Sequence, residues 1–188
     1  MREVAQRSQT NLASAHYHFG SKEAMVLEML QKRVRPINQR RMQYLAEARE
    51  RSAGKPLSTR DILRALILPI GEEIAKSSHT RQTLAQLVAR TFTEPAKFIQ
   101  TMHRKFFGEL CEKFMDELRK THPKVDEEDL YWNLHLAVSS MLGALAQHRR
   151  LNDFSKGKCD EEDTQDMIER LITFATHGFE AGIGQQST

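Results

Sequence analysis

Histidines and acidic clusters are the side chains of this sequence that could support catalysis or metal binding. His16 and His18 are two positions apart, so they cannot share one face of a helix. No His-Glu-x-x-His or Cys-x-x-Cys spacing occurs, and no phosphate-binding loop or nucleophile elbow is present. Four further histidines each stand alone on an expected helix: His103, His135, His148 and His177. The acidic runs at 126–129 and 160–163 precede apolar stretches, where they would cap helices. We therefore predict no enzyme, no cofactor and no metal site.

Residues 4–23 have the residue types of a helix, a tight turn, a short helix, a second turn and a long helix. Asn11 is a good N-cap for the short helix, since its side-chain oxygen can accept a free backbone N–H. Gly20 tolerates the left-handed conformation that ends a helix, and Ser21 can cap the next one. Small residues at 13–15 allow a close approach to another surface.

In these residues the chain resembles the TetR family of one-component transcription regulators. Four motifs carry the resemblance: Val4-Ala5, Asn11-Leu12-Ala13-Ser14, Tyr17-His18-Phe19 and Ser21-Lys22-Glu23. It implies an all-α fold with a truncated helix-turn-helix domain over 1–45, followed by a helical ligand-binding and dimerisation domain over 46–188. It also implies a homodimeric, cytoplasmic bacterial repressor, released from a double-stranded, pseudo-palindromic DNA operator by a small apolar or amphipathic molecule. The segment Tyr131–His135 is similar to a branch with fatty-acyl-responsive members, so a fatty-acyl-like effector is expected.

The family places its second short helix in the DNA major groove. Carried over to this chain, the resemblance implies base contacts from Asn11, Leu12, Ser14 and His16, and phosphate contacts from Thr10, Tyr17, His18 and Lys22. Lys22 stands beside the free N–H groups of a helix start, where an anion is favoured. Core packing is the alternative role for Tyr17 and Phe19, and for Phe19 it is the preferred one.

Three departures from the family pattern concern the DNA-reading segment. The helix that precedes Val4 in the family is not in the sequence, Gln9 replaces a turn glycine, and Thr10 replaces an apolar turn residue. We therefore expect residues 1–188 alone to bind DNA weakly or not at all. A helical ligand-binding or dimerisation module that has lost DNA binding is the main alternative.

Charge is unevenly distributed: residues 1–51 hold ten Lys/Arg against five Asp/Glu, while the whole chain has a net charge of +3. A basic end suits a polyanionic partner, although a solvated charged face explains it equally well. No apolar run is long enough to span a bilayer, and two cysteines favour free thiols over a disulfide framework.

Apolar residues recur at spacings of three and four, which predicts helices throughout. The expected ranges are 21–49, 58–77, 81–92, 96–120, 126–150 and 160–182. Pro69 predicts a kink or break in the second of these. Gly178 and Gly182 lie one turn apart, which indicates either close approach by another helix or fraying at the chain end.

The ligand pocket is expected inside the larger domain, with ordinary core packing as the alternative for each residue. Its candidate lining is Leu66, Ile70, Leu87, Phe106, Trp132 and His135. The resemblance further implies a dimer interface made by the last two helices and their symmetry mates. Its candidates are Leu134, Met141, Leu145, Ile168, Leu171, Ala175, Gly178 and Phe179.

Overall fold

The computed structural model describes residues 22–91, 96–147, 150–160 and 162–184, which form helices joined by turns and no strand. The helices in order are α3 (Lys22–Arg51), α4 (Thr59–Ala75), α5 (Ser78–Thr91), α6 (Ala96–Thr121), α7 (Glu127–Gln147), α8 (Arg150–Ser155) and α9 (Thr164–Gly184). The predicted all-α fold is confirmed for this part of the chain.

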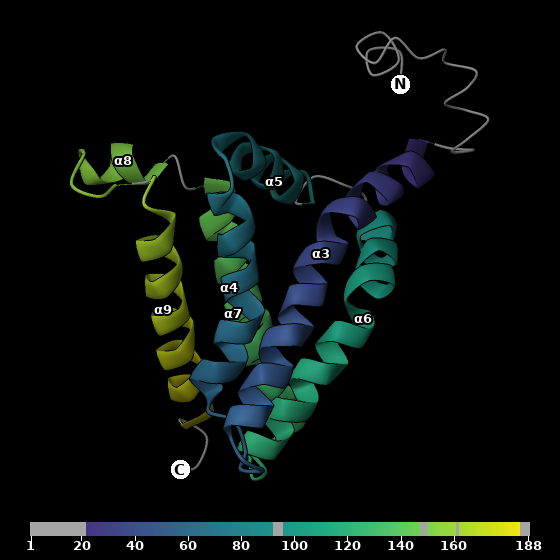
Figure 1. Ribbon diagram of the computed structural model, residues 1–188, viewed down its shortest axis with the longest axis vertical. Helices are drawn as coiled ribbons and strands as arrows, with labels where there is room; N and C mark the ends of the chain where they lie inside the picture. Colours follow the sequence, from purple (N-terminus) through teal and green to yellow (C-terminus); the bar gives the residue numbers. More distant parts are fainter. Residues whose placement is uncertain (1–21, 92–95, 148–149, 161, 185–188) are drawn as a thin grey trace, which may run out of the picture.

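The long helices form a bundle with α4 and α7 at its centre (Figure 1). Helix α9 flanks them on one side, α3 and α6 flank them on the other, and α5 and α8 lie across the end where α3 begins. Helix α4 packs against α3, α5, α6 and α9, while α7 packs against α5, α6 and α9. The central helices therefore connect α3, α5, α6 and α9 into one core.

Helix α4 is central because apolar residues cover most of its circumference. Ten of its 17 residues are buried, whereas a helix at the surface would bury a single stripe. The Ser58 hydroxyl caps its first turn by accepting the Asp61 N–H at 3.1 Å. Each fully buried Leu or Ile on α4 stabilises the fold by about 1.5–3 kcal/mol.

Pro69 lies inside α4, yet the helix continues through it from Thr59 to Ala75, so the expected break does not occur. A proline lacks the N–H that would bind the carbonyl four residues earlier and disturbs the preceding turn. In that turn the Leu66 carbonyl accepts a 2.8 Å hydrogen bond from Nε of Arg41 on α3. A donor from a neighbouring helix thus serves the backbone next to the proline. Pro36 is likewise accommodated within α3.

Two glycines let α9 approach its neighbours closely. A Cβ added at Gly71 of α4 would lie 2.6 Å from Cγ1 of Ile168, and one at Gly182 would lie 2.1 Å from Oδ1 of Asn133 on α7. Close approach by another helix, expected for Gly178 and Gly182, thus occurs at Gly182. Gly178 is exposed, and a Cβ there would meet nothing within 4 Å.

The six helices expected after residue 20 are all present, with ends that differ by a few residues. The helices expected before that point lie outside the described residues. Asp163 caps α9 by accepting the Asp166 N–H at 2.9 Å, and three acids occupy the first turn of α7. Helix α8 was not expected, since its six residues are too few for a periodic apolar pattern.

Helix α3 crosses the predicted domain boundary at 45/46 without interruption. Ile37, Leu45 and Ala48 of α3 belong to the same core as α4 and α7, on both sides of that boundary. The division of the chain into two domains stays a prediction.

The α3–α6 contact includes an ion pair that is buried on one side only. The Glu117 side chain is 4% exposed and accepts hydrogen bonds from Arg49 of α3 and from Lys120. Burial alone would raise the pKa of Glu117, but these two cations lower it below its usual value. The carboxylate therefore stabilises the folded state most when it is ionised.

The close approach at Gly71 predicts that Gly71→Ala destabilises the protein. The methyl group overpacks against Ile168 at a cost of about 1–3 kcal/mol, which exceeds the gain of about 1 kcal/mol in helix propensity. The control is Gly108→Ala on α6, where a Cβ meets nothing within 4 Å. Urea unfolding should show opposite signs for the two variants, and equal stabilisation by both would contradict the packing described.

The lowered pKa of Glu117 predicts that Glu117→Gln loses about 1 kcal/mol of stability near neutral pH. Because the folded pKa lies below the unfolded one, this contribution is complete above the unfolded pKa and is lost as the pH falls from there through the folded pKa. The unfolding temperatures of wild type and variant should therefore converge as the pH falls below the usual pKa range of a glutamate. The exposed Glu112→Gln is the control, and a difference independent of pH would refute the assignment.

Candidate functional site

Most of the predicted DNA-contacting residues lie outside the described residues. These are Thr10, Asn11, Leu12, Ser14, His16, Tyr17 and His18. Lys22 is the first residue of α3, as expected for a residue at a helix start. Their contacts with DNA stay predictions.

The basic charge on α3 is partly neutralised within the chain. Lys32 pairs with Glu28, Arg40 with Glu72, and Arg49 with Glu117. Arg33 and Arg35 are exposed, whereas Arg41 is buried. The charge count of residues 1–51 therefore overstates the cations of α3 that can face a polyanion.

The six predicted pocket residues do not gather around one cavity in the described part of the chain. Leu66 and Ile70 are in the core, and Leu87 packs against it. Phe106 is half-buried, whereas Trp132 and His135 are exposed. The last two line a shallow hollow of about 470 Å³ together with Glu127, Glu128 and Tyr131, with the Trp132 and His135 rings edge to face at 6.2 Å.

The core between α3, α4 and α7 contains a buried arginine that the sequence reasoning did not single out. Arg41 is 3% exposed. Its Nε donates to the Leu66 carbonyl at 2.8 Å, its Nη1 donates to Oδ1 of Asn38 at 3.0 Å, and its Nη2 lies 3.8 Å from Sδ of Met141. The Asn38 amide in turn donates to the Phe106 carbonyl at 2.7 Å, which brings α6 into the same polar group.

Burial lowers the pKa of Arg41 to about 10, and the nearby Cys111 thiol, as a thiolate, acts in the opposite direction. The guanidinium therefore remains charged at neutral pH. Burial also raises the pKa of Cys111, an effect that Arg41 opposes. The sequence held a signal for this site, because Arg41 lies four residues after Ile37 and four before Leu45, on the apolar stripe of its helix.

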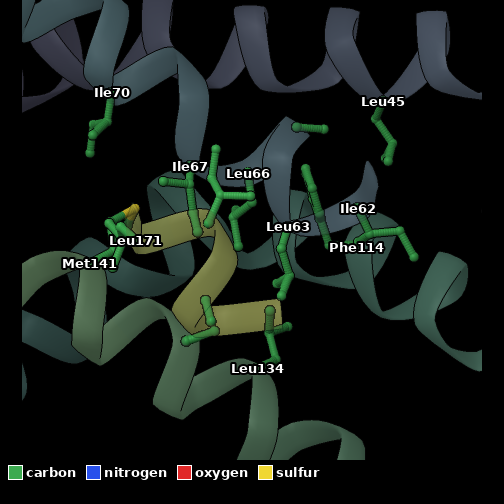
Figure 2. Close-up of a cluster of buried hydrophobic side chains, with 14 of the residues drawn as sticks. Leu45, Ile62, Leu63, Leu66, Ile67, Ile70, Phe114, Leu134, Met141 and Leu171 are labelled. Atoms are coloured by element: carbon green, nitrogen blue, oxygen red, sulfur yellow. The ribbon is translucent and has the colours of Figure 1, made fainter. Parts of the chain in front are cut away.

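Seven of the eight predicted dimer-interface residues are buried within the single chain. They are Leu134, Met141, Leu145, Ile168, Leu171, Ala175 and Phe179, and only Gly178 is exposed. Figure 2 shows Leu134, Met141 and Leu171 directed into the core among the α4 side chains. The most apolar stripe of each helix thus faces its own core. The part of these residues in a dimer interface stays a prediction.

Large apolar side chains do remain exposed on the other faces of α7 and α9. Trp132 and Leu136 of α7 are 58% and 56% exposed, and Phe174 of α9 is 67% exposed. Because Asn133 near the start of α7 meets Gly182 near the end of α9, the two helices run antiparallel. Counted from that contact, Leu136 lies level with Phe179, next to Gly178. We call Trp132, Leu136, Phe174 and Gly178 the exposed α7/α9 face.

A second apolar hollow, of about 410 Å³, lies where α8 meets the ends of α7 and α9. It is lined by Ala144, Gln147, Arg150, Leu151, Phe154, Asp160 and Met167. Phe154 is 87% exposed, so the hollow is open rather than an enclosed chamber.

Within the described ranges, no group of three His, Cys, Asp or Glu side chains could hold a metal ion. In the same ranges, no helix combines the length and apolarity needed to cross a membrane.

Comparison with models of known protein families gives a match to most of the bundle. The family model described as a tetracyclin repressor-like C-terminal domain matches residues 64–178, from the first turns of α4 to near the end of α9. A search of curated proteins finds no match to the chain. The matched region contains α5, α6, α7 and α8, together with most of α4 and α9.

Proposed function

Because the chain belongs to the TetR family of regulators, we propose that it is a homodimeric, DNA-binding transcription repressor controlled by a small apolar or amphipathic molecule. The family match over residues 64–178 carries this proposal. The motifs at 4–23 support it independently, since they lie outside the matched region and stand in the family's order. We place the regulator in the bacterial cytoplasm, where its DNA is found.

The proposed DNA contacts come from the segment that precedes and begins α3. Thr10, Tyr17, His18 and Lys22 fix the register on phosphates, while Asn11, Leu12, Ser14 and His16 read base edges. Two-fold symmetry would then match two operator half-sites about 34–36 Å apart.

We propose that the dimer forms through the exposed α7/α9 face. Single exposed apolar residues are common, but several large ones on neighbouring helices mark an interaction surface. Gly178 lies open beside them, which allows the backbone of a partner helix to come close. The alternative set, the buried stripes of α7 and α9, is already occupied by intramolecular packing.

The proposed link between ligand and DNA is α3. Its 30 residues span about 45 Å, from the segment with the DNA-reading motifs to the far end of the bundle. It contacts α4 and α6 in the core. A ligand that favours a different position of α3 would change the spacing of the two reading heads, to the extent of its differential affinity for the two states.

DNA binding is tested by selection from a random duplex pool, with residues 1–188 and with the protein translated from the start of its gene. We expect the second to enrich a pseudo-palindrome. Replacing both Asn11 and Ser14 by Ala should weaken binding to it by at least about tenfold. Lys22→Gln should weaken binding to all sequences and reduce the salt slope by about 1.

The control for the DNA test is Lys124→Gln, which removes an exposed cation between α6 and α7. It should change neither the affinity for DNA nor the salt slope. Ligand-free dimers that enrich no duplex from either preparation would favour a module that has lost DNA binding. Unchanged selection after both recognition-segment substitutions would refute the proposed contacts.

The dimer surface is tested by Leu136→Glu and Phe174→Glu. Each should raise the dimer dissociation constant by about tenfold or more, because a charge is desolvated against an apolar partner. Light scattering coupled to size-exclusion chromatography measures the mass. Met42→Glu puts the same charge on an exposed apolar residue of α3 and should leave the dimer intact. A dimer that persists in both α7/α9 variants would exclude this face.

A further inference from the structure

Among the described residues, the buried arginine has no counter-charge, while several exposed ones do. Arg40, Arg49, Arg64 and Arg119 each have a carboxylate partner, and their side chains are 35–46% exposed. Arg41 is 3% exposed and has no Asp or Glu within 4.0 Å in the ranges described. A buried charge is costly unless it is paired, so Arg41 stands out from the pattern of its own chain.

The hydrogen bonds of Arg41 leave part of its guanidinium free for another acceptor. A guanidinium has five N–H donors. One serves the Leu66 carbonyl, one serves the Asn38 amide oxygen, and one points to the Met141 thioether, which is a weak acceptor at 3.8 Å. All three partners are neutral. In the part of the chain described, each terminal nitrogen thus has one further N–H available.

The hydrogen bond from Arg41 to the turn before Pro69 explains only part of why a charged guanidinium is buried here. Nε alone serves the Leu66 carbonyl, and a neutral donor could do the same without burying a charge. The planar fork formed by Nη1 and Nη2 is the geometry that binds carboxylate or phosphate oxygens in pairs. That fork lies against Asn38 and Met141.

Apart from Asn38, the surroundings of the fork are apolar, and they include a side chain that can move. Met141 is unbranched and flexible, so its weak contact with Nη2 can be replaced by that of a stronger acceptor. Figure 2 shows Met141 in the same part of the core as Leu66, Ile67, Ile70 and Leu171. A molecule that reaches Arg41 would therefore have its body among aliphatic side chains.

We propose that Arg41 is the anion-binding residue of the effector site, and that the effector is an apolar molecule with one anionic headgroup, a carboxylate or a phosphate. This inference rests on the proposed ligand-controlled function. The headgroup replaces the Met141 sulfur at Nη2 and also bonds Nη1, while the apolar body packs between α4 and α7. The ligand then supplies the missing counter-charge between α3, α4 and α7, which ties it directly to the helix that leads to the DNA-reading segment.

The test compares anionic and neutral molecules of equal length on the purified full chain, without DNA. The probes are alkyl carboxylates from octanoate to hexadecanoate, the matched alcohols and the matched alkyl phosphates, each below its micellar concentration. Isothermal titration calorimetry should give anionic probes an affinity about 10–100-fold higher than that of the matched alcohols. A comparison of the affinities for the alkyl carboxylates and for the alkyl phosphates identifies the preferred headgroup. Equal affinity for anionic and neutral probes, or no binding of any anionic probe, would overturn the proposal.

Variants of Arg41 separate a ligand-binding role from a structural one. Arg41→Met should abolish the anionic preference while leaving the ligand-free melting temperature unchanged or higher, since an unpaired buried charge is removed. Arg41→Lys keeps a point charge without the fork and should retain an intermediate preference. Arg35→Met replaces an exposed arginine of the same helix and should leave the preference intact.

A full anionic preference in Arg41→Met, or a lower melting temperature with unchanged preference, would assign Arg41 a purely structural role. If Arg41→Met does not fold, the role of Arg41 is decided by the titration of Arg41→Lys and by the comparison of anionic and neutral probes on the wild type. Because these assays contain no DNA, loss of DNA binding does not affect them. Conversely, operator release by a neutral ligand alone would refute this inference and leave the proposed function standing.

Discussion

The burial of α4 on nearly all sides is the constraint on which the rest of the bundle depends. A helix with ten buried residues out of 17 needs neighbours around most of its circumference, and α3, α5, α6 and α9 supply them. Such apolar surroundings offer few hydrogen-bond partners to a backbone group that has none within its own helix. The helix nevertheless contains Pro69, and Arg41 brings a donor to the adjacent turn from α3. In the described part of the chain, α4 therefore organises the apolar core and provides the carbonyl that the buried Arg41 bonds.

The sequence predicted the helices well because their signals are local. Ser58 and Asp163 cap α4 and α9 as their residue types favour, and the apolar spacing located every long helix within a few residues. Helix α8 was too short to produce such a pattern. Helix α4 continues through Pro69 because its packing against α3, α5, α6 and α9 outweighs the local preference for a break.

The functional surfaces were harder to predict, since periodicity identifies apolar stripes without saying what they face. The stripe of Leu134 and Met141 on α7 lies in the core of its own chain, while Trp132 and Leu136 point outward. The pocket prediction combined Leu66 from the core with Trp132 from the surface for the same reason. Arg41 could have been found from its place between Ile37 and Leu45. Its lack of an acidic partner among the described residues depends on residues far away in the sequence.

The two glycine contacts set how closely α9 packs against its neighbours. Gly71 against Ile168 and Gly182 against Asn133 bring α9 nearer to α4 and α7 than a side chain at either glycine would allow. Helix α3 is held in a different way. It shares the apolar core with α4 through Ile37, Leu45 and Ala48, and it is joined to α6 by polar contacts of Asn38 and Arg49. The α3–α6 contact is thus one in which polar partners can be exchanged, whereas the α9 contacts depend on the exact fit of one helix against another.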